Sequence, residues 1–409
     1  MANFRGDDVG HSILDDRFAA LPGGPFARLR TLLDGIMPGD SEISLALGEP
    51  RHAPPQKVLS RLAQADGYDR YPPIQGLPVL RHAIHAWLQR RFGLPNALID
   101  PEIQILPLNG TREGLFMAAQ LAPQKPDGLV IMPDPFYQVY AAAALARGDT
   151  PYYLPAQAEH HFLPHLEGLS EDILARCSCF YLCSPANPQG TVADRAYLEH
   201  LIALAQQYNF ILCIDECYAD IYDRPLMSAP PLSILSVLKP ETIEQAPVLS
   251  FHSLSKRSNL PGLRSGFVTG GGALMRRFSA LRLVAGPQSP IAAQEAAALA
   301  WQDDDHASEN RTLYHQKIDT AEEIFGTSFG FYRPPGGFFL WLNVGDGIRA
   351  THHIWQHSGV RVLPGAYLSA NPTHPNAAPY IRVAIVSAPE ENRVALQRLY
   401  DSLISLEAA

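Results

Sequence analysis

The chain has 409 residues, of which 46% are hydrophobic and 18% are charged, and its formal net charge is -9. This composition predicts a globular protein with a large core and excludes a mainly disordered chain. The negative charge argues against binding of nucleic acid across the whole surface, so we expect no nucleic-acid partner.

The sequence also carries no sign of export or of a membrane span. The first residues contain no apolar signal core, and no apolar stretch is long enough to cross a bilayer. We therefore expect no membrane partner and a cytoplasmic location. The five cysteines lie in or beside apolar runs, which is typical of reduced core thiols. Cys213 and Cys217 lack the paired spacing of a zinc site, so we expect no metal.

The predicted elements start with a helix over residues 22–36 and a strand over residues 43–50. Short apolar runs then alternate with helix-like stretches between residues 100 and 270. The runs span residues 103–108, 129–132, 179–183, 210–214, 248–251 and 266–269. This alternation predicts an α/β fold, with a mostly parallel central sheet between two helical layers as a three-layer α/β/α arrangement.

The pattern changes beyond residue 290. An alanine-rich helix is expected over residues 291–301, and residues 338–344 and 380–386 alternate like strands of a smaller sheet with one exposed face. The sequence therefore predicts a smaller α+β domain built from the two chain ends. Its first part is an N-terminal arm over residues 1–51, and its second part spans residues 291–409. Residues 52–290 form the predicted large ligand-binding domain.

A lysine follows the apolar run at residues 248–251. The segment Ser253-Leu254-Ser255-Lys256 places it at the end of a buried strand, where an amine costs free energy unless it is paired or chemically used. A primary amine can hold an aldehyde cofactor covalently, and the hydroxyls of Ser253 and Ser255 with the guanidinium of Arg264 can bind its phosphate. Taken alone, the segment also fits a surface lysine in a serine-rich loop.

Four other strand ends supply different groups. Gly110 and Thr111 open a helix whose start can seat an anion. Tyr137 can stack on a flat ring, the amide of Asn187 is fixed between two prolines, and Asp215 can pair with a protonated ring nitrogen. Each segment alone also fits a structural role as a helix cap, a core aromatic, a turn or a salt bridge. Pyridoxal 5'-phosphate uses all five groups, so one shared cofactor is the simpler interpretation.

These motifs resemble those of the fold-type I pyridoxal-phosphate aminotransferases of class I/II, over roughly residues 20–400. The resemblance implies that Lys256 holds the cofactor and moves the substrate proton. It implies that Asp215 pairs with the ring nitrogen and that Asn187 and Tyr218 hydrogen-bond the ring hydroxylate. Tyr137 is the implied stacking residue.

The resemblance also implies the partners of the cofactor phosphate. They are Gly110, Thr111, Ser253 and Arg264, with Arg112 beside them. Tyr71 resembles the tyrosine that reaches the phosphate of the neighbouring subunit, so a homodimer is expected.

The partners implied by the resemblance are small-molecule substrates, an amino acid and a 2-oxo acid. Arg382 matches the arginine that binds the substrate α-carboxylate in a bidentate fork. The backbone of Gly48 and the amide of Asn187 are expected on the substrate side. Arg17, Arg28 and Arg30 are candidates by position for the distal end of the substrate.

Within the family, four segments resemble the succinyldiaminopimelate aminotransferases. They span residues 25–33, 109–113, 254–259 and 362–368. This resemblance implies amino transfer between glutamate and N-succinyl-2-amino-6-oxopimelate, in lysine and diaminopimelate biosynthesis. Tyr137 departs from the tryptophan of the aspartate branch. The open alternatives are an aminotransferase for aspartate, alanine or aromatic substrates, and a carbon–sulfur lyase that uses the same cofactor.

Overall fold

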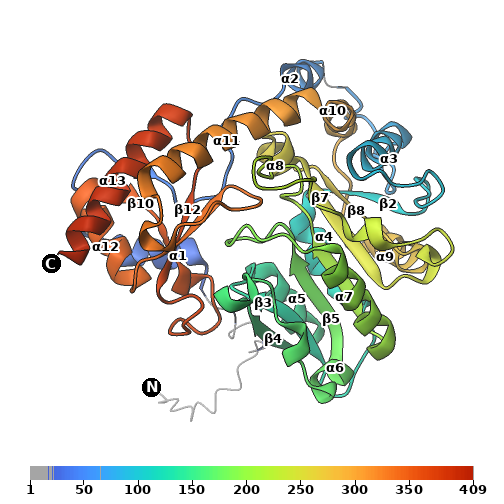
Figure 1. Ribbon diagram of the computed structural model, residues 1–409. Coiled ribbons are helices and arrows are strands. Elements are labelled where there is room, and N and C mark those ends of the chain that lie inside the picture. The colour runs from blue at the N-terminus through green and yellow to red at the C-terminus, as the bar shows by residue number, and fades with distance from the viewer. Residues whose placement is uncertain (1–16, 18–20, 22, 65, 409) are drawn as a thin grey trace, which may run out of the picture.

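The computed structural model describes residues 17, 21, 23–64 and 66–408, and these residues form two lobes (Figure 1). The larger lobe contains a seven-stranded sheet in the order β2-β8-β7-β6-β5-β3-β4. Only β8 runs against its neighbours, so the predicted mostly parallel α/β fold is confirmed. The strands are β2 (Ile105–Leu108), β3 (Leu129–Asp134), β4 (Thr150–Pro155), β5 (Cys177–Cys183), β6 (Ile211–Asp215), β7 (Val248–Ser253) and β8 (Gly266–Gly270).

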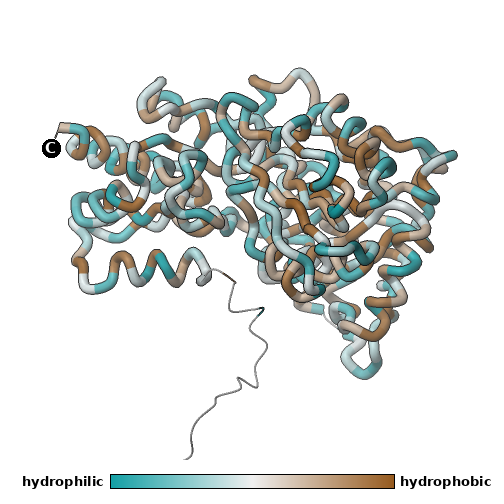
Figure 2. Tube along the Cα trace, turned by 90° about the horizontal axis from the view of Figure 1, so that it is seen from below, coloured by the Kyte–Doolittle hydropathy of each residue, from teal (hydrophilic) through white to brown (hydrophobic). Residues whose placement is uncertain are grey.

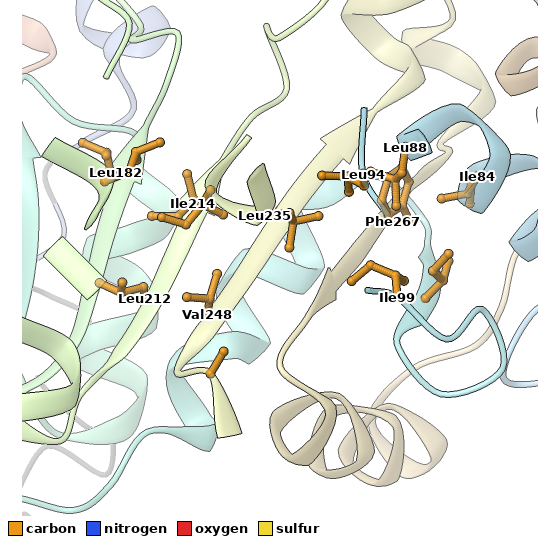
Figure 3. Close-up of a cluster of buried hydrophobic side chains, with 14 of the residues drawn as sticks. Ile84, Leu88, Leu94, Ile99, Leu182, Leu212, Ile214, Leu235, Val248 and Phe267 are labelled. Atoms are coloured by element: carbon orange, nitrogen blue, oxygen red, sulfur yellow. The ribbon is translucent and has the colours of Figure 1, made fainter. Parts of the chain in front are cut away.

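Helices cover both faces of this sheet because successive strand residues point to opposite sides. In β6, Leu212 and Ile214 belong to the core beneath α3, α6, α7 and α10, whereas Ile211 and Cys213 belong to the core beneath α4, α5 and α9. Figure 3 shows the first core, with Leu212, Ile214 and Val248 beside one another. The helices are α3 (Pro78–Phe92), α4 (Thr111–Ala118), α5 (Gln138–Arg147), α6 (Glu171–Arg176), α7 (Arg195–Tyr208), α9 (Gly272–Ala285) and α10 (Ile291–Gln302).

The smaller lobe joins the two ends of the described chain. The strand β1 (Ile43–Ser44) pairs in parallel with β10 (Val360–Arg361), and an antiparallel sheet has the order β11-β12-β9. Hydrophobic and hydrophilic residues alternate along its helices in Figure 2, as amphipathic packing requires. The elements are α1 (Pro25–Leu33), β9 (Phe339–Asn343), α11 (Asp305–Phe325), α12 (Gly347–Ser358), β11 (Leu363–Pro364), β12 (Tyr380–Ala384) and α13 (Pro389–Glu407).

The smaller antiparallel sheet is buried on both faces, so the prediction of one exposed face is wrong. Leu340 and Leu342 pack into a core with α11 and α13, while Trp341 packs on the other side with α1 and α12. The N-terminal helix α1 covers the face that the local sequence pattern leaves open. Arg382, the register partner of Trp341, is therefore only 4% exposed.

Two further helices, α2 (Gln56–Ala63) and the short α8 (Leu254–Arg257), belong to the region around the larger sheet, and α2 packs on α10. The predicted strand over residues 43–50 is shorter than expected, because only Ile43 and Ser44 pair with β10 and the chain then continues as a loop. The domain boundaries at residues 51/52 and 290/291 stay a prediction. Among the described helices, none combines the length and the apolar character that crossing a bilayer requires.

Candidate active site

A cavity of about 350 Å³ lies at the carboxyl ends of the parallel strands and is lined from both lobes. This is where ligands of open α/β sheets bind, because the loops after the strands converge there. Most of the residues predicted from the sequence line it: Gly48, Thr111, Arg112, Tyr137, Asn187, Asp215, Tyr218, Ser253, Ser255, Lys256, Arg264 and Arg382.

Lys256 reaches the cavity because β7 ends at Ser253 and the short helix α8 follows at once. Its Nζ donates a hydrogen bond to Gly48 O at 2.5 Å and lies 5.6 Å from the centroid of the Phe338 ring. Burial lowers the pKa of Lys256 to about 8. A substantial fraction of the amine is therefore neutral close to physiological pH, which is the form that attacks a carbonyl.

Asp215 is the last residue of β6 and follows Ile211 and Cys213 on the sheet face that α4 and α5 cover. Its Oδ2 accepts a 3.0 Å hydrogen bond from Tyr140 Oη, and its Oδ1 accepts one of 3.2 Å from Cys217 N. Burial raises the pKa of Asp215, and these hydrogen bonds oppose the shift. A cationic partner in the cavity would complete the stabilisation of this carboxylate.

Tyr140 is a residue of the site that the sequence reasoning did not assign. It is 1% exposed and lies in α5, three residues after Tyr137, so the two rings project from neighbouring positions of one helix start. Tyr140 stacks on Tyr181 of β5 with ring centroids 4.5 Å apart. The i, i+3 spacing of Tyr137 and Tyr140 is the sequence feature that could have indicated that both lie on the same side of the helix.

The loops that open α4 and precede β8 make one end of the cavity. Gly110 has φ +80°, and a Cβ there would lie 2.1 Å from Arg264 Nη2. Arg264 donates from Nη1 to Pro261 O at 2.8 Å, and Ser253 Oγ donates to Ser255 Oγ at 2.9 Å. The backbone at residue 110 can lie this close to the Arg264 guanidinium only because the residue is glycine. Hydroxyl and guanidinium groups beside the backbone N–H groups of a helix start are an arrangement suited to a phosphate.

Arg112 contacts the aromatic wall of the cavity. Its Nε donates to Tyr137 Oη at 2.6 Å, and its guanidinium carbon lies 5.9 Å from the Tyr137 ring centroid. Burial raises the pKa of Tyr137, although Arg112 opposes the shift. Tyr137 therefore donates or accepts as a neutral phenol, and Arg112 fixes the orientation of its ring.

Arg382 lies on the opposite side, in the smaller lobe. Its Nη1 donates to Asn187 Oδ1 at 3.1 Å and its Nη2 to Ala46 O at 2.8 Å. Burial lowers the pKa of Arg382 to about 10, with Tyr218 opposing the shift, so the guanidinium stays charged at neutral pH. A buried cation held by one amide and one carbonyl is ready to bind a carboxylate.

The cavity therefore collects four cations, Arg112, Lys256, Arg264 and Arg382. None of them has a carboxylate within ion-pairing distance among the described residues. Of these four, Arg382 is buried and Lys256 is partly buried, whereas Arg112 and Arg264 are exposed. Buried guanidiniums elsewhere in the described chain are paired, as Arg257 is with Asp220. Unpaired cations gathered in one cavity indicate anionic ligands. No group of three or more metal-binding side chains occurs within the described ranges.

Some predicted residues lie outside the cavity. Tyr71 is 98% exposed and does not line it, and Gly110 lies beneath Arg264 instead. Arg17, Arg28 and Arg30 are not among its lining residues. The Arg28 guanidinium lies 4.1 Å from the centroid of the Tyr367 ring.

The cavity thus brings together groups that suit a phosphate, a carbonyl compound and a carboxylate. A sequence model of the family "aminotransferase class I and II" matches residues 40–399. The chain belongs to this family. These enzymes use pyridoxal 5'-phosphate and act on amino acids and 2-oxo acids.

Individual relatives agree with this assignment. The LL-diaminopimelate aminotransferase of Dehalococcoides mccartyi is 29% identical over 366 residues, which cover 86% of this chain and 90% of the relative. The 4-dedimethylamino-4-oxo-anhydrotetracycline transaminase OxyQ of Streptomyces rimosus is 33% identical over 370 residues, with 88% and 93% covered. A solved aminotransferase structure from Neisseria meningitidis superposes with a TM-score of 0.87 at 33% identity, covering 96% of this chain and all of that one.

The residues present fit pyridoxal 5'-phosphate. The Gly110 backbone lies against the Arg264 guanidinium, which suits a phosphate, and the buried carboxylate of Asp215 suits a protonated ring nitrogen. Lys256 supplies the amine, and Tyr137 supplies a flat wall. When bound, the cofactor withdraws the negative charge that develops at the substrate α-carbon.

Proposed function

We propose that the chain moves an amino group between glutamate and N-succinyl-2-amino-6-oxopimelate, as a succinyldiaminopimelate transaminase of lysine and diaminopimelate biosynthesis. The observation that carries the proposal is the set of four cavity cations without carboxylate partners among the described residues. The cofactor would use Arg264 through its phosphate and Lys256 through its aldehyde, and the α-carboxylate of an amino acid would use Arg382. One cation is left for a second carboxylate, which both glutamate and the succinylated acceptor possess.

In this proposal Lys256 is the covalent anchor and the proton carrier. Its amine would hold the cofactor through the aldehyde group and, as a free amine, would accept the proton of the substrate α-carbon. Asp215 keeps the ring nitrogen protonated, because a buried carboxylate gains most from a cation beside it. Asn187 and Tyr218 are proposed to hydrogen-bond the ring hydroxyl.

Arg382 is proposed to hold the α-carboxylate, and Arg112 the distal one. The Asn187 side chain, already bonded to Arg382 Nη1, sets the angle of the guanidinium. Arg112 uses Nε for Tyr137, which leaves its two terminal nitrogens for a ligand. The apolar side chains of Phe26 and Leu368 line the same cavity and suit the methylene groups between the two carboxylates.

LL-diaminopimelate itself is the second candidate substrate. Several relatives are LL-diaminopimelate aminotransferases, and Glu49 also lines the cavity. LL-diaminopimelate carries a distal ammonium that a glutamate can bind, whereas the succinylated nitrogen is an uncharged amide. Both substrates have a second carboxylate for Arg112, so Glu49 is the residue that would distinguish the distal ammonium from the amide.

A homodimer belongs to the same proposal. Tyr71 is 98% exposed and remote from its own cavity, as expected for a residue that completes the phosphate site of a second copy. Replacement of Tyr71 by phenylalanine should therefore weaken cofactor binding in the dimer without unfolding the chain.

The test is a panel of amino acceptors with glutamate as the donor. The proposal expects 2-oxoglutarate release, with a higher kcat/KM for the succinylated oxo acid than for oxaloacetate, pyruvate or phenylpyruvate. Equal or better use of oxaloacetate would refute the substrate assignment. Release of ammonia and pyruvate from a thioether amino acid, with no transfer, would favour the carbon–sulfur lyase alternative. LL-diaminopimelate as donor to 2-oxoglutarate tests the second candidate in the same assay.

A further inference from the structure

A buried lysine outside the candidate site is connected to Lys256 by side-chain hydrogen bonds. Lys317 of α11 is 1% exposed, and no carboxylate lies within ion-pairing distance of it among the described residues. Its Nζ lies 2.6 Å from His52 Nε2 and 4.8 Å from the centroid of the Tyr314 ring. His52 and Tyr314 are the titratable groups that face it. An amine buried without an anion is costly, so its position calls for a reason.

The hydrogen bonds of this lysine lead to Lys256. His52 Nδ1 lies 2.6 Å from Asn310 Oδ1, and Asn310 Nδ2 donates at 3.3 Å to the backbone oxygens of both Lys256 and Arg257. The two carbonyls only accept, so the Asn310 amide must face them with Nδ2. Its Oδ1 then accepts from His52, and the neutral imidazole accepts from Lys317. All these hydrogen bonds therefore run in one direction, with each donor nearer to Lys317 than its acceptor. In such a hydrogen-bonded series each bond polarises and strengthens the next.

Aromatic rings connect the same two lysines a second time. Tyr314 stacks on Phe338 with ring centroids 5.3 Å apart, and Lys256 Nζ lies 5.6 Å from the Phe338 centroid. The loop that carries His52 also carries Gly48, whose carbonyl accepts from Lys256 Nζ. The loop from residue 48 to residue 52 thus contacts Lys256 at the amine and, through Asn310, at the backbone.

We propose that Lys317 is a positioning residue for Lys256, acting through His52 and Asn310. The ordered donor chain fixes the C-terminal carbonyls of the four-residue helix α8, which has too few internal hydrogen bonds to hold its own orientation. Lys317 donates into this chain and keeps the imidazole in the tautomer that serves Asn310. The inference rests on the proposed role of Lys256 as the cofactor anchor.

Protonation of His52 would break this order. An imidazolium donates from both nitrogens, so its Nε2 would face the N–H groups of Lys317 instead of accepting from them. Burial lowers the pKa of His52, which favours the neutral imidazole that can accept from Lys317. The Lys317 amine has N–H groups to donate in either protonation state. The position of Lys256 should therefore be sensitive to Lys317 in a way that a simple packing contact would not be.

The experiment compares the cofactor-loaded wild type with Lys317→Met, His52→Leu, His52→Gln and the double variant Lys317→Met/His52→Leu. The first readout is the pH midpoint of the visible absorption of the bound cofactor, and the second is the rate of cofactor release. Glutamine can accept and donate as the imidazole does, so His52→Gln is the conservative replacement. Lys125→Met is the matched control, because Lys125 also donates to backbone oxygens but lies remote from the cavity.

The proposal expects Lys317→Met and His52→Leu to shift the midpoint in the same direction. Each should speed cofactor release about 5- to 10-fold, as the loss of one buried hydrogen bond implies. The double variant should add little, and His52→Gln and Lys125→Met should resemble wild type. Unchanged midpoints and release rates in both single variants would overturn the proposal, whatever happens to their melting temperatures. A wild type without the covalent absorption would instead refute the role of Lys256 itself.

Discussion

Tyr140 Oη donates a 3.0 Å hydrogen bond to Asp215 Oδ2 in the interior of the larger lobe. The two residues come from different elements, α5 and the end of β6, and meet because both face the core that α4 and α5 cover. The phenol is the second anchor of the carboxylate beside Cys217 N. It helps keep a buried acid ionised at the position where the cofactor ring nitrogen is proposed to bind.

Tyr140→Phe should raise the pKa of Asp215 and weaken cofactor binding. Loss of a buried hydrogen bond to a charged group costs about 1.5–3 kcal/mol, so the cofactor Kd should rise roughly 10- to 100-fold. Tyr181→Phe is the matched control, since Tyr181 is equally buried, stacks on Tyr140, and donates its hydrogen bond to Leu115 O and not to Asp215. Titration of cofactor into both apoproteins measures the difference. Equal Kd values for the two variants would contradict the assigned role.

Gly110→Ala should damage the phosphate end of the cavity. The added Cβ would lie 2.1 Å from Arg264 Nη2, and the φ of +80° is itself strained for alanine. Arg264 must move, so the affinity for cofactor and for inorganic phosphate should fall at least about 10-fold. Gly262→Ala is the control, because a Cβ there meets nothing within 4 Å. Calorimetric titration with phosphate distinguishes the variants, and unchanged phosphate affinity in Gly110→Ala would place the anion site elsewhere.

Arg112→Gln should separate dicarboxylic from monocarboxylic substrates. Glutamine keeps a hydrogen-bond donor for Tyr137 but removes the charge, and a charge-assisted bond contributes about 1.5–3 kcal/mol. The kcat/KM for glutamate should therefore fall roughly 10- to 100-fold, while that for alanine changes little. Steady-state kinetics with both donors measure the ratio. A parallel loss for alanine would assign Arg112 to the cofactor phosphate, as the family resemblance implies.

The stability of the protein should depend on pH through Lys317. Burial lowers its folded-state pKa from 10.5 to about 7. The native state therefore binds a proton at Lys317 more weakly than the unfolded state does, and protonation destabilises the fold. The destabilisation is complete below about pH 7 and disappears as the pH rises from about 7 to 10.5. Lys317→Met removes the titrating group. Denaturant unfolding should therefore show the variant more stable than wild type at about pH 6, with a smaller difference at about pH 9. A difference that is constant with pH would mean that Lys317 does not titrate in this range.

The fold and the polar residues at the strand ends could be predicted from the sequence because both depend on local patterns. Apolar runs that alternate with helices define a parallel sheet, and the residue after each strand necessarily lies at one edge of it. The burial of Arg382 could not be read in this way, since α1 and the loop after β1 cover it from more than 300 residues away in sequence. Lys317 was missed for the same reason, because its partners are set by tertiary packing. The spacing of Tyr140 from Tyr137 could have drawn attention to it, but its hydrogen bond to Asp215 also depends on tertiary packing.

The central claim is that Lys256 holds the cofactor aldehyde covalently. The chain has five lysines, and Lys317 serves as an internal control because its pKa is also lowered although it does not line the cavity. Cofactor-loaded protein is reduced with borohydride, digested, and analysed by peptide mass spectrometry. The account predicts the mass of the reduced cofactor on the peptide that contains Lys256, and on no peptide of the Lys256→Ala variant treated in parallel. A label on another lysine, or an unlabelled Lys256 in protein that transfers amino groups, would contradict it.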